Sequence, residues 1–302
     1  MLVLNYEGRG SSPLSDTVIG LEAMQNQISQ LEQGVSFAID IAKQLINNKK
    51  ILILTGAGLS TDSGIPDYRG EGRVARHPMT YDTFMESFEA RQRYWARSFV
   101  GWSRISLASP NNGHDCLAKA EKSGNILGIV TQNVDGLHTS AGSSKVIDLH
   151  GRLDRVICLG CQNLISRTEM DKLLELHNPG ISKDANVEFT PDGDAEIQGT
   201  EDFKVPSCSA CGGILKPDVV FFGENVPKQR VADSFELLEK ADVLLVAGSS
   251  LTVNSGFRFA RQAHKESKPI VIVNLGPTRA DNLATVKIEA NTSLALERLF
   301  FD

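Results

Sequence analysis

Short apolar runs alternate with helix-like segments along most of the chain. Five of the runs have the length of buried strands; they cover residues 51–54, 126–130, 146–149, 243–247 and 270–274. Segments with helical spacing of apolar residues separate several of them, for example residues 233–240 and 256–265. This alternation predicts an α/β fold with a mostly parallel sheet and helices on both of its faces.

The pattern is less regular at the start of the chain and between residues 153 and 215. Residues 1–34 mix small and polar side chains, which predicts a loosely ordered leader with one short helix around residues 19–31. From Val35 onward apolar residues recur at helical spacing. We therefore expect a main domain formed by residues 35–152 and 216–302, interrupted by a small module at residues 153–215.

That module contains two cysteine pairs, Cys158 with Cys161 and Cys208 with Cys211, each at C-x-x-C spacing. Two such pairs can surround one tetrahedral zinc ion and leave no coordination position open, so the predicted site is structural. Redox-active or incidental pairs are the alternative. Disulfides fit less well, because nothing else indicates a secreted protein. The fifth cysteine, Cys116, is expected to be a small buried apolar residue.

Composition and charge narrow the functional classes. The 302 residues have a formal net charge of -6, which disfavours a general nucleic-acid binder. No apolar run reaches the length of a membrane span. The first thirty-odd residues lack the features of a secretory signal and contain several acids but one arginine, so a cytoplasmic location is expected over the mitochondrial matrix.

Small and polar residues follow the predicted strands. Gly56, Ala57, Gly58 and Ser60 come directly after the first strand, where small side chains let backbone N–H groups approach a pyrophosphate. A G-x-G sequence by itself is weak evidence, because it is also typical of a tight turn without a ligand. Other polar segments follow strands at Thr131, His150, Gly248 and Asn274. In a parallel sheet these strand ends share one edge, so the sequence predicts one ligand site there.

The motifs, taken in order, resemble those of one family. They are GAGLSTDSGIPDYRG (56–70), TQNVDGLH (131–138), LHG (149–151), KPDVVFFGE (216–224), GSSLTV (248–253) and NLGPTRAD (274–281). With the cysteine pairs between LHG and KPDVVFFGE, the chain from about Val35 to its end resembles the sirtuins, which are NAD-dependent protein-lysine deacylases with a Rossmann-like NAD-binding domain. RQRYWARSFVGW (91–102), PDGD (191–194) and NLGPTRAD resemble the class II branch, which includes mitochondrial sirtuin 4 and bacterial relatives.

The resemblance assigns cofactor contacts to individual residues. It implies that Ala57, Gly58, Ser60 and Arg69 hold the pyrophosphate of NAD, that Gly248, Ser249 and Ser250 contact phosphate and ribose, and that Asn274, Leu275 and Gly276 contact the adenosine ribose. It places Gln132, Asn133 and Asp135 at the nicotinamide ribose. The nicotinamide pocket would be lined by Ile65 and Asp135, and Tyr68 would screen the cleaved bond from water. Gly56, Asp67 and Thr292 complete the expected NAD-binding set.

The resemblance also identifies the catalytic residues as His150, Asn133 and Asp135. A lone histidine after a strand is more often structural, and His77, His114 and His138 are expected to be structural or exposed. In the LHG motif, however, His150 would deprotonate a ribose hydroxyl after the acyl-lysine oxygen has displaced nicotinamide. A near-neutral imidazole suits that task.

Acylated-lysine proteins are the expected partners of a monomeric enzyme that binds neither nucleic acid nor membrane. The resemblance implies that residues 216–224 pair with the substrate peptide, with Val220, Phe221, Phe222 and Gly223 at the acyl-lysine; an ordinary buried strand is the alternative. Three other functions stay open. They are mono-ADP-ribosyl transfer, removal of longer or lipoyl groups as the main activity, and a regulatory role in which the protein binds NAD without turnover.

Overall fold

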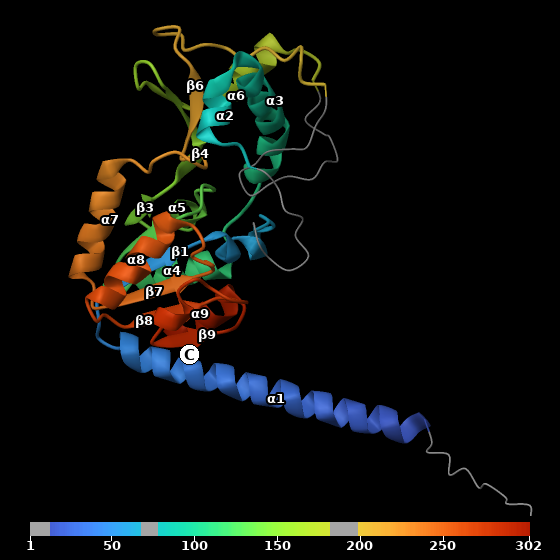
Figure 1. The fold of residues 1–302 in the computed structure, drawn as a ribbon, viewed down its shortest axis with the longest axis vertical. Coiled ribbons are helices and arrows are strands. Elements are labelled where there is room, and N and C mark those ends of the chain that lie inside the picture. The colour runs from blue at the N-terminus through green and yellow to red at the C-terminus, as the bar shows by residue number, and fades with distance from the viewer. Residues whose placement is uncertain (1–12, 68–77, 182–198) are drawn as a thin grey trace, which may run out of the picture.

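The computed structural model describes residues 13–67, 78–181 and 199–302, with residues 13–29 described as backbone (Figure 1). Its main sheet has six strands in the order β3-β2-β1-β7-β8-β9, and every neighbouring pair is parallel. The strands are β1 (Ile51–Thr55), β2 (Ile126–Thr131), β3 (Val146–Asp148), β7 (Val243–Ala247), β8 (Ile270–Val273) and β9 (Val286–Ile288). The predicted Rossmann-like parallel sheet is confirmed, and β9 is an additional edge strand.

Helices cover both faces of this sheet (Figure 1). On one face α4 (Asn112–Lys122), α9 (Thr292–Phe300) and the end of α1 (Pro13–Ile46) share a buried apolar cluster with Ile53 and Leu245. On the other face α7 (Lys228–Lys240) and α8 (Asn254–Lys265) pack against Leu52 and Val246. All five residues of β1 are buried because both faces are covered, so the strand is apolar from Ile51 to Leu54 and does not alternate.

Helix α1 differs from the sequence prediction. It is continuous from Pro13 to Ile46, so the described part of the expected leader, from residue 13, is helical and has no break near residue 34. Its last turns bury Ile39, Ala42 and Ile46, and Figure 1 shows its first turns extending away from the body of the molecule. Residues 21–33 are rich in Leu, Met, Gln and Glu, which favour helix. The cost of about 1 kcal/mol for Gly34 inside a helix is too small to interrupt it.

A second, smaller region lies at one end of the main sheet (Figure 1). It contains an antiparallel sheet in the order β5-β4-β6, built from β4 (Gly151–Cys158), β5 (Leu164–Ser166) and β6 (Leu215–Val219), with α6 (Arg167–His177) beside it. Two helices from before the predicted module, α2 (Tyr81–Glu86) and α3 (Phe88–Ile105), share its apolar core. The small region therefore includes residues that the sequence division placed in the main domain.

Aromatic packing holds these separate segments together. Trp95 of α3 is fully buried, and its indole N–H donates to the Leu215 carbonyl of β6 at 3.1 Å. Arg167 of α6 is also buried, 2 % exposed, where it pairs with Asp171 and lies over the rings of Trp95 and Trp102. The ion pair and the cation–π contacts compensate the cost of burying this charge.

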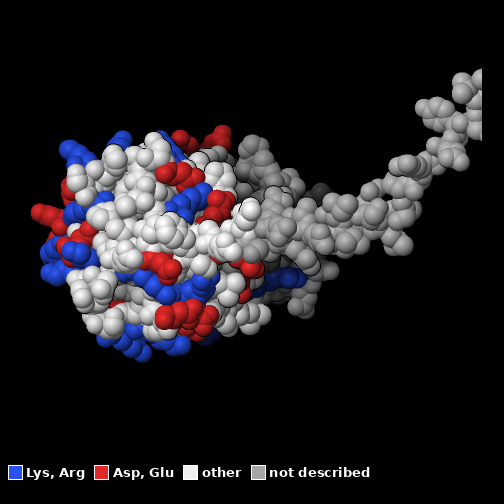
Figure 2. Space-filling model, turned by 90° about the horizontal axis from the view of Figure 1, so that it is seen from below, with Lys and Arg blue, Asp and Glu red and all other residues white. Residues whose placement is uncertain are grey.

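Four short elements complete the secondary structure of the described residues. They are the 3-10 turns η1 (Ala57–Leu59), η2 (Thr61–Ser63) and η3 (Asp281–Leu283) and the helix α5 (Leu137–Ser140). No helix among the described residues is long and apolar enough to cross a bilayer. On the face drawn in Figure 2, basic and acidic side chains of the described residues are interspersed.

Gly151 begins β4 at the junction of the two regions, and its replacement tests that junction. Its φ is +82°, and an added Cβ would lie 1.9 Å from the Asp218 carbonyl oxygen. Gly151→Ala should therefore lower the free energy of unfolding by roughly 3 kcal/mol or more, since backbone atoms must move. Urea denaturation measures this loss.

Gly142→Ala is the matched control. Gly142 also has a positive φ, +96°, but an added Cβ there meets nothing within 4 Å, so only the conformational cost of about 1 kcal/mol applies. If both variants lose the same stability, the close contact with Asp218 is not what requires glycine at residue 151.

Candidate functional site

Two glycine-containing loops meet at the edge of the main sheet where β1 and β7 end. Gly58 N–H donates to the Gly248 carbonyl at 2.8 Å. A Cβ on Gly58 would lie 3.0 Å from that oxygen, and one on Gly248, whose φ is +64°, would lie 2.3 Å from the Leu59 nitrogen. The contact thus requires glycine at residue 248 and leaves little room for a larger side chain at residue 58. The chain order of the strands reverses between β1 and β7, which is where such folds bind dinucleotides.

Asn133, Asp135 and Ser60 form one hydrogen-bonded group beside this loop. The Asn133 side-chain amide donates to Ser60 Oγ at 2.9 Å and to the Gly56 carbonyl at 3.1 Å. Ser60 Oγ in turn donates to Asp135 Oδ2 at 2.7 Å. Asn133 is 8 % exposed, so its amide is fixed by these bonds. The structure brings these three predicted residues together.

His150 follows β3 and lies between the end of β2 and the start of α8. Its Nδ1 is 2.9 Å from the Gln132 carbonyl oxygen, and its Nε2 is 2.7 Å from Ser255 Oγ. The pKa of His150 is lowered to about 4, mainly by burial and to a smaller extent by the charges of Arg258 and Arg230, against the opposing effect of the Gln132 carbonyl. The imidazole is therefore neutral at pH 7 and available as a base.

Gln132 connects His150 to the glycine loops. Its side-chain amide donates to Ser249 Oγ at 2.7 Å and to the Thr55 carbonyl at 3.2 Å. Ser249 is buried, and its hydroxyl also accepts the Leu251 N–H at 3.2 Å. Ser250 lies next to it, with its Oγ 3.0 Å from Thr252 Oγ1. The predicted residues that follow β1, β2 and β7 thus lie along one continuous edge of the main sheet.

The predicted adenosine segment follows β8 on the same edge. Asn274 Nδ2 donates to the Leu275 carbonyl at 2.7 Å and to the Gly276 carbonyl at 3.2 Å, and Leu275 is 65 % exposed. Thr292 is buried in the first turn of α9, next to Ser293, whose hydroxyl donates to Asp62 at 2.6 Å. The Asn274 side chain holds this exposed turn in one conformation, so the turn is suited to contact a ligand.

The residues predicted near the nicotinamide are described only in part. Ile65 is buried and its N–H donates to the Ser60 carbonyl at 3.3 Å, which places it beside the Ser60–Asp135 pair. Asp67 is the last described residue of that loop. Tyr68 and Arg69 lie outside the described residues, as does the PDGD run at 191–194.

The predicted substrate segment runs past His150 on the side of the small region. Val220 N–H donates to the His150 carbonyl at 2.7 Å, and Tyr81 N–H donates to the Phe222 carbonyl at 2.9 Å. Phe221 points into the core, where its ring packs against Phe84 and Tyr94. Gly223 turns the chain with a φ of +83°. Val220 is therefore adjacent to the predicted base, whereas the ring of Phe221 supports the core.

Sequence reasoning missed Ser255 and gave Lys216 no role apart from its segment, whereas it expected His114 and His138 to be structural or exposed. Ser255 bonds to His150 although 105 residues separate them. Lys216 is buried under Phe221 and forms an ion pair with Glu224 at 3.0 Å; burial lowers its pKa. His114 and His138 are buried with ring centroids 4.9 Å apart, and His138 Nε2 lies 2.9 Å from Thr55 Oγ1.

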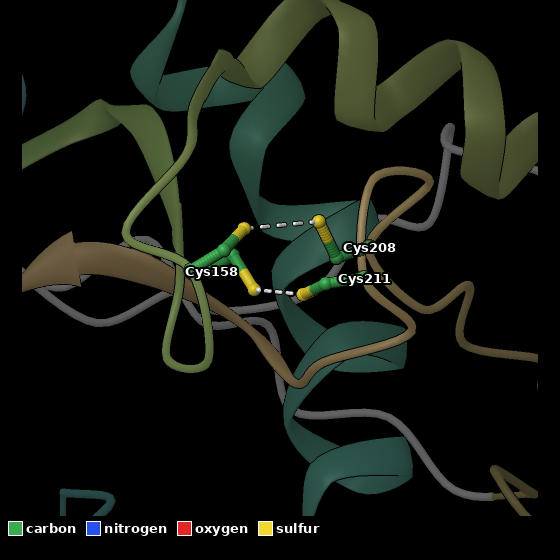
Figure 3. Close-up of side chains that lie close together, drawn as sticks. Cys158, Cys208 and Cys211 are labelled. Carbon is green, nitrogen blue, oxygen red and sulfur yellow. Dashed lines mark hydrogen bonds between the residues drawn. The ribbon is translucent and has the colours of Figure 1, made fainter.

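The four predicted cysteine ligands form one cluster in the small region. Figure 3 shows three of them labelled, with the sulfur atoms directed toward a common centre. The Sγ atoms of Cys158 and Cys211 are 3.5 Å apart, those of Cys161 and Cys208 are 3.8 Å apart, and all four lie within 4.8 Å of one another. These separations are too long for disulfide bonds of about 2.05 Å.

The cluster matches the requirements of a zinc ion. Four sulfurs at about 2.3 Å from a tetrahedral zinc are about 3.8 Å from each other. Hydrogen bonds from the backbone N–H of Cys161 and from that of Gly160, which is 3.4 Å from Cys158 Sγ, lower the pKa of the Cys158 thiol to about 6. A Cβ on Gly213 would lie 2.8 Å from the same sulfur, so glycine leaves room for the ligands. The four residues can hold a structural zinc.

Strand order, glycine loops and the cysteine cluster define a dinucleotide-binding α/β protein with a structural zinc module. The close contact of the two glycine loops at the ends of β1 and β7 fits the backbone approach that NAD requires. Residues 56–255 match the Sir2 family. The chain belongs to this family.

Individual relatives agree. The chain is 52 % identical over 253 residues to an NAD-dependent protein deacetylase of Xanthomonas campestris pv. campestris, covering 82 % of this chain and 86 % of the relative. It is 46 % identical over 250 residues to the mitochondrial NAD-dependent protein lipoamidase sirtuin-4 of Bos taurus, covering 80 % of this chain and 79 % of the relative. The predicted resemblance to sirtuin 4 and to bacterial sirtuins is confirmed.

Solved structures show the same fold. A Sir2–p53 peptide–NAD+ structure superposes with a TM-score of 0.68 at 32 % identity and covers 85 % of this chain and 94 % of that chain. A structure of Sir2Tm bound to a propionylated peptide gives a TM-score of 0.67 at 32 % identity, with the same coverage. The fold of these solved structures agrees with the family that the sequence match shows.

Removal of one zinc ligand tests the cysteine cluster. Cys158→Ser should lose the bound metal and a large part of the thermal stability, because the remaining ligands cannot hold the small region together. Purified wild-type protein should contain about one zinc per chain by elemental analysis. Cys116→Ala, which changes a buried cysteine outside the cluster, should keep the metal; a wild-type protein without zinc would contradict the assignment.

The lowered pKa of His150 predicts a pH dependence of stability. Between pH 6.5, the ordinary pKa, and pH 4 the unfolded chain takes up a proton that the folded protein excludes. His150 therefore reduces the free energy of unfolding by up to about 3 kcal/mol as the pH falls through this window. Urea denaturation of His150→Asn should show a shallower decline over the same range. Equal slopes for both proteins would contradict the prediction.

Proposed function

We propose that this protein removes acyl groups from lysine side chains of proteins, consumes NAD and releases nicotinamide. The observation that supports it best is His150, a neutral imidazole held by Gln132 beside the Asn133–Ser60–Asp135 group. The names of the relatives support the same chemistry, since they include protein deacetylases and a lipoamidase.

NAD, when bound, supplies a ribose carbon from which nicotinamide can leave. The residues of the site would then have separate roles in binding and in proton transfer. Asn133 and Asp135 hold hydrogen-bonding groups in fixed positions at the edge of the sheet and orient the nicotinamide end. His150 Nε2 takes the proton of a ribose hydroxyl, and Gln132 keeps the imidazole in place through Nδ1.

The substrate is proposed to be an acylated lysine in an extended protein segment that binds next to Val220. Its backbone bond to His150 brings this segment within reach of the base. The lipoamidase relative supports longer acyl groups in addition to acetyl. A monomeric state and a cytoplasmic location stay predictions from the sequence.

Mass spectrometry of peptides tests the proposal. One peptide sequence with acetyl-, succinyl-, glutaryl-, lipoyl- or biotinyl-lysine is incubated with NAD and the wild-type protein. We expect NAD-dependent loss of at least one acyl group, and a fall of about 100-fold or more for His150→Ala, the usual effect of removing a general base. His264→Ala, a change of an exposed histidine at the far end of α8, should keep the wild-type rate.

The other outcomes point to other functions. NAD consumption without acyl loss, together with ADP-ribose on protein, would replace the proposal by mono-ADP-ribosyl transfer. Binding of NAD without any turnover would replace it by a regulatory role.

A further inference from the structure

Ser255 lies in the first turn of α8 and contacts the proposed base directly. Its hydroxyl oxygen is 2.7 Å from His150 Nε2, and the residue is 8 % exposed, so water has little access to this bond. The imidazole is thus held at both ring nitrogens, by Gln132 on one side and by Ser255 on the other.

The two partners determine which nitrogen has the proton. A carbonyl oxygen can only accept a hydrogen bond, so Nδ1, which faces the Gln132 carbonyl at 2.9 Å, is the protonated nitrogen. In the neutral ring Nε2 then has a free lone pair, and the Ser255 hydroxyl donates to it. This is the tautomer in which Nε2 can act as the base.

Gly256 gives independent evidence that the start of α8 is fitted to this group. A Cβ on Gly256 would lie 2.4 Å from Gln132 Oε1 and 2.7 Å from Gln132 Cδ. The Gln132 amide cannot easily move aside, because it is bonded to the Thr55 carbonyl and to Ser249 Oγ. Only glycine lets the first turn of α8 approach closely enough for Ser255 to reach His150.

The charged groups around the ring favour its neutral form. Arg258 of α8 and Arg230 of α7 both disfavour a proton on His150. Arg230 also pairs with Asp218 of β6 at 3.0 Å. In the neutral ring the Ser255 hydroxyl donates to Nε2, and it would have to rotate and accept from Nε2–H once the ring is protonated.

We propose that Ser255 is a positioning residue that holds His150 in the orientation and tautomer in which Nε2 is the base. Its catalytic consequence rests on the proposed function, whereas the hydrogen bond itself does not. Ser255 keeps the lone pair of Nε2 directed toward the start of α8, and it gives up this bond when the ribose hydroxyl delivers its proton to the same nitrogen.

NMR of the ligand-free protein tests the hydrogen bond. The chain has six histidines, so protein labelled with ¹³C and ¹⁵N in histidine gives few ring signals, and His150→Gln identifies the signal of His150. In the wild type the ring should be the Nδ1-protonated tautomer with a pKa of about 4. Ser255→Ala should raise this pKa by about one pH unit, because the hydroxyl that covers Nε2 is removed and solvent that reaches the ring stabilises its charged form.

Three further variants separate this role from general packing. Ser255→Thr retains the hydroxyl and should keep the pKa of His150. Gly256→Ala should raise the pKa as Ser255→Ala does, because it displaces the first turn of α8. Ser234→Ala removes another buried hydroxyl, one that donates to the Arg230 carbonyl at 2.7 Å, and should leave His150 unchanged. An unchanged pKa and tautomer in Ser255→Ala would overturn the proposal.

Kinetics test the catalytic consequence. Ser255→Ala should lower kcat for acyl release by about three- to tenfold, the effect of one hydrogen bond, without changing KM for the acyl peptide. Exchange of labelled nicotinamide into NAD, which precedes the step that needs the base, should keep its rate, and Ser255→Thr should restore kcat. A fall in both rates would indicate a structural role.

The two proposals fail in different ways. If the wild type releases no acyl group, the proposed function is wrong, and the NMR experiment still decides whether Ser255 positions His150. If the wild type is active and Ser255→Ala equals it in kcat and in the pKa of His150, only the role of Ser255 is wrong.

Discussion

The geometry of the site depends on Gln132. Its carbonyl holds the imidazole of His150, and its side-chain amide reaches the Thr55 carbonyl and Ser249. One residue at the end of β2 therefore fixes the ends of β1, β2 and β7 relative to each other and to the base. Because the amide spans the point where the strand order reverses, displacement of Gln132 changes the cofactor loop and the base together.

The site is shared between two cores. His150 follows the last strand on one side of the main sheet, and Gly151 starts the first strand of the small region. The Val220 N–H, directly after β6, donates to the His150 carbonyl, so β4 begins and β6 ends next to the base. Side chains of β4 and β6 pack in the aromatic core around Trp95 and Phe84, which holds the two strands in place. A rigid second region allows the base to be placed accurately although it lies on a connecting segment.

Much of this arrangement could be predicted from the sequence, and the exceptions have physical causes. The strand runs are apolar because both faces of the sheet are buried, so they could be recognised locally. The contact between Ser255 and His150 joins residues far apart in the chain and leaves no local pattern. The direction of Phe221 was ambiguous because four apolar residues in a row, 219–222, do not show which face is buried. Helix α3 lies before the cysteines in the chain, so its packing with the zinc module had no sequence signal.

The cysteine cluster has a further consequence for how the chain can vary. Cys161 precedes α6 and Cys208 precedes β6, so the ligands come from the two ends of the long segment that connects β4 to β6. A metal at this point holds the two ends together, and the entropy cost of closing this segment into a loop grows only with the logarithm of its length. Insertions after α6 would thus cost little and would not propagate to β4 or β6. The metal would thus separate the placement of β4 and β6 from the length of the chain between Cys161 and Cys208.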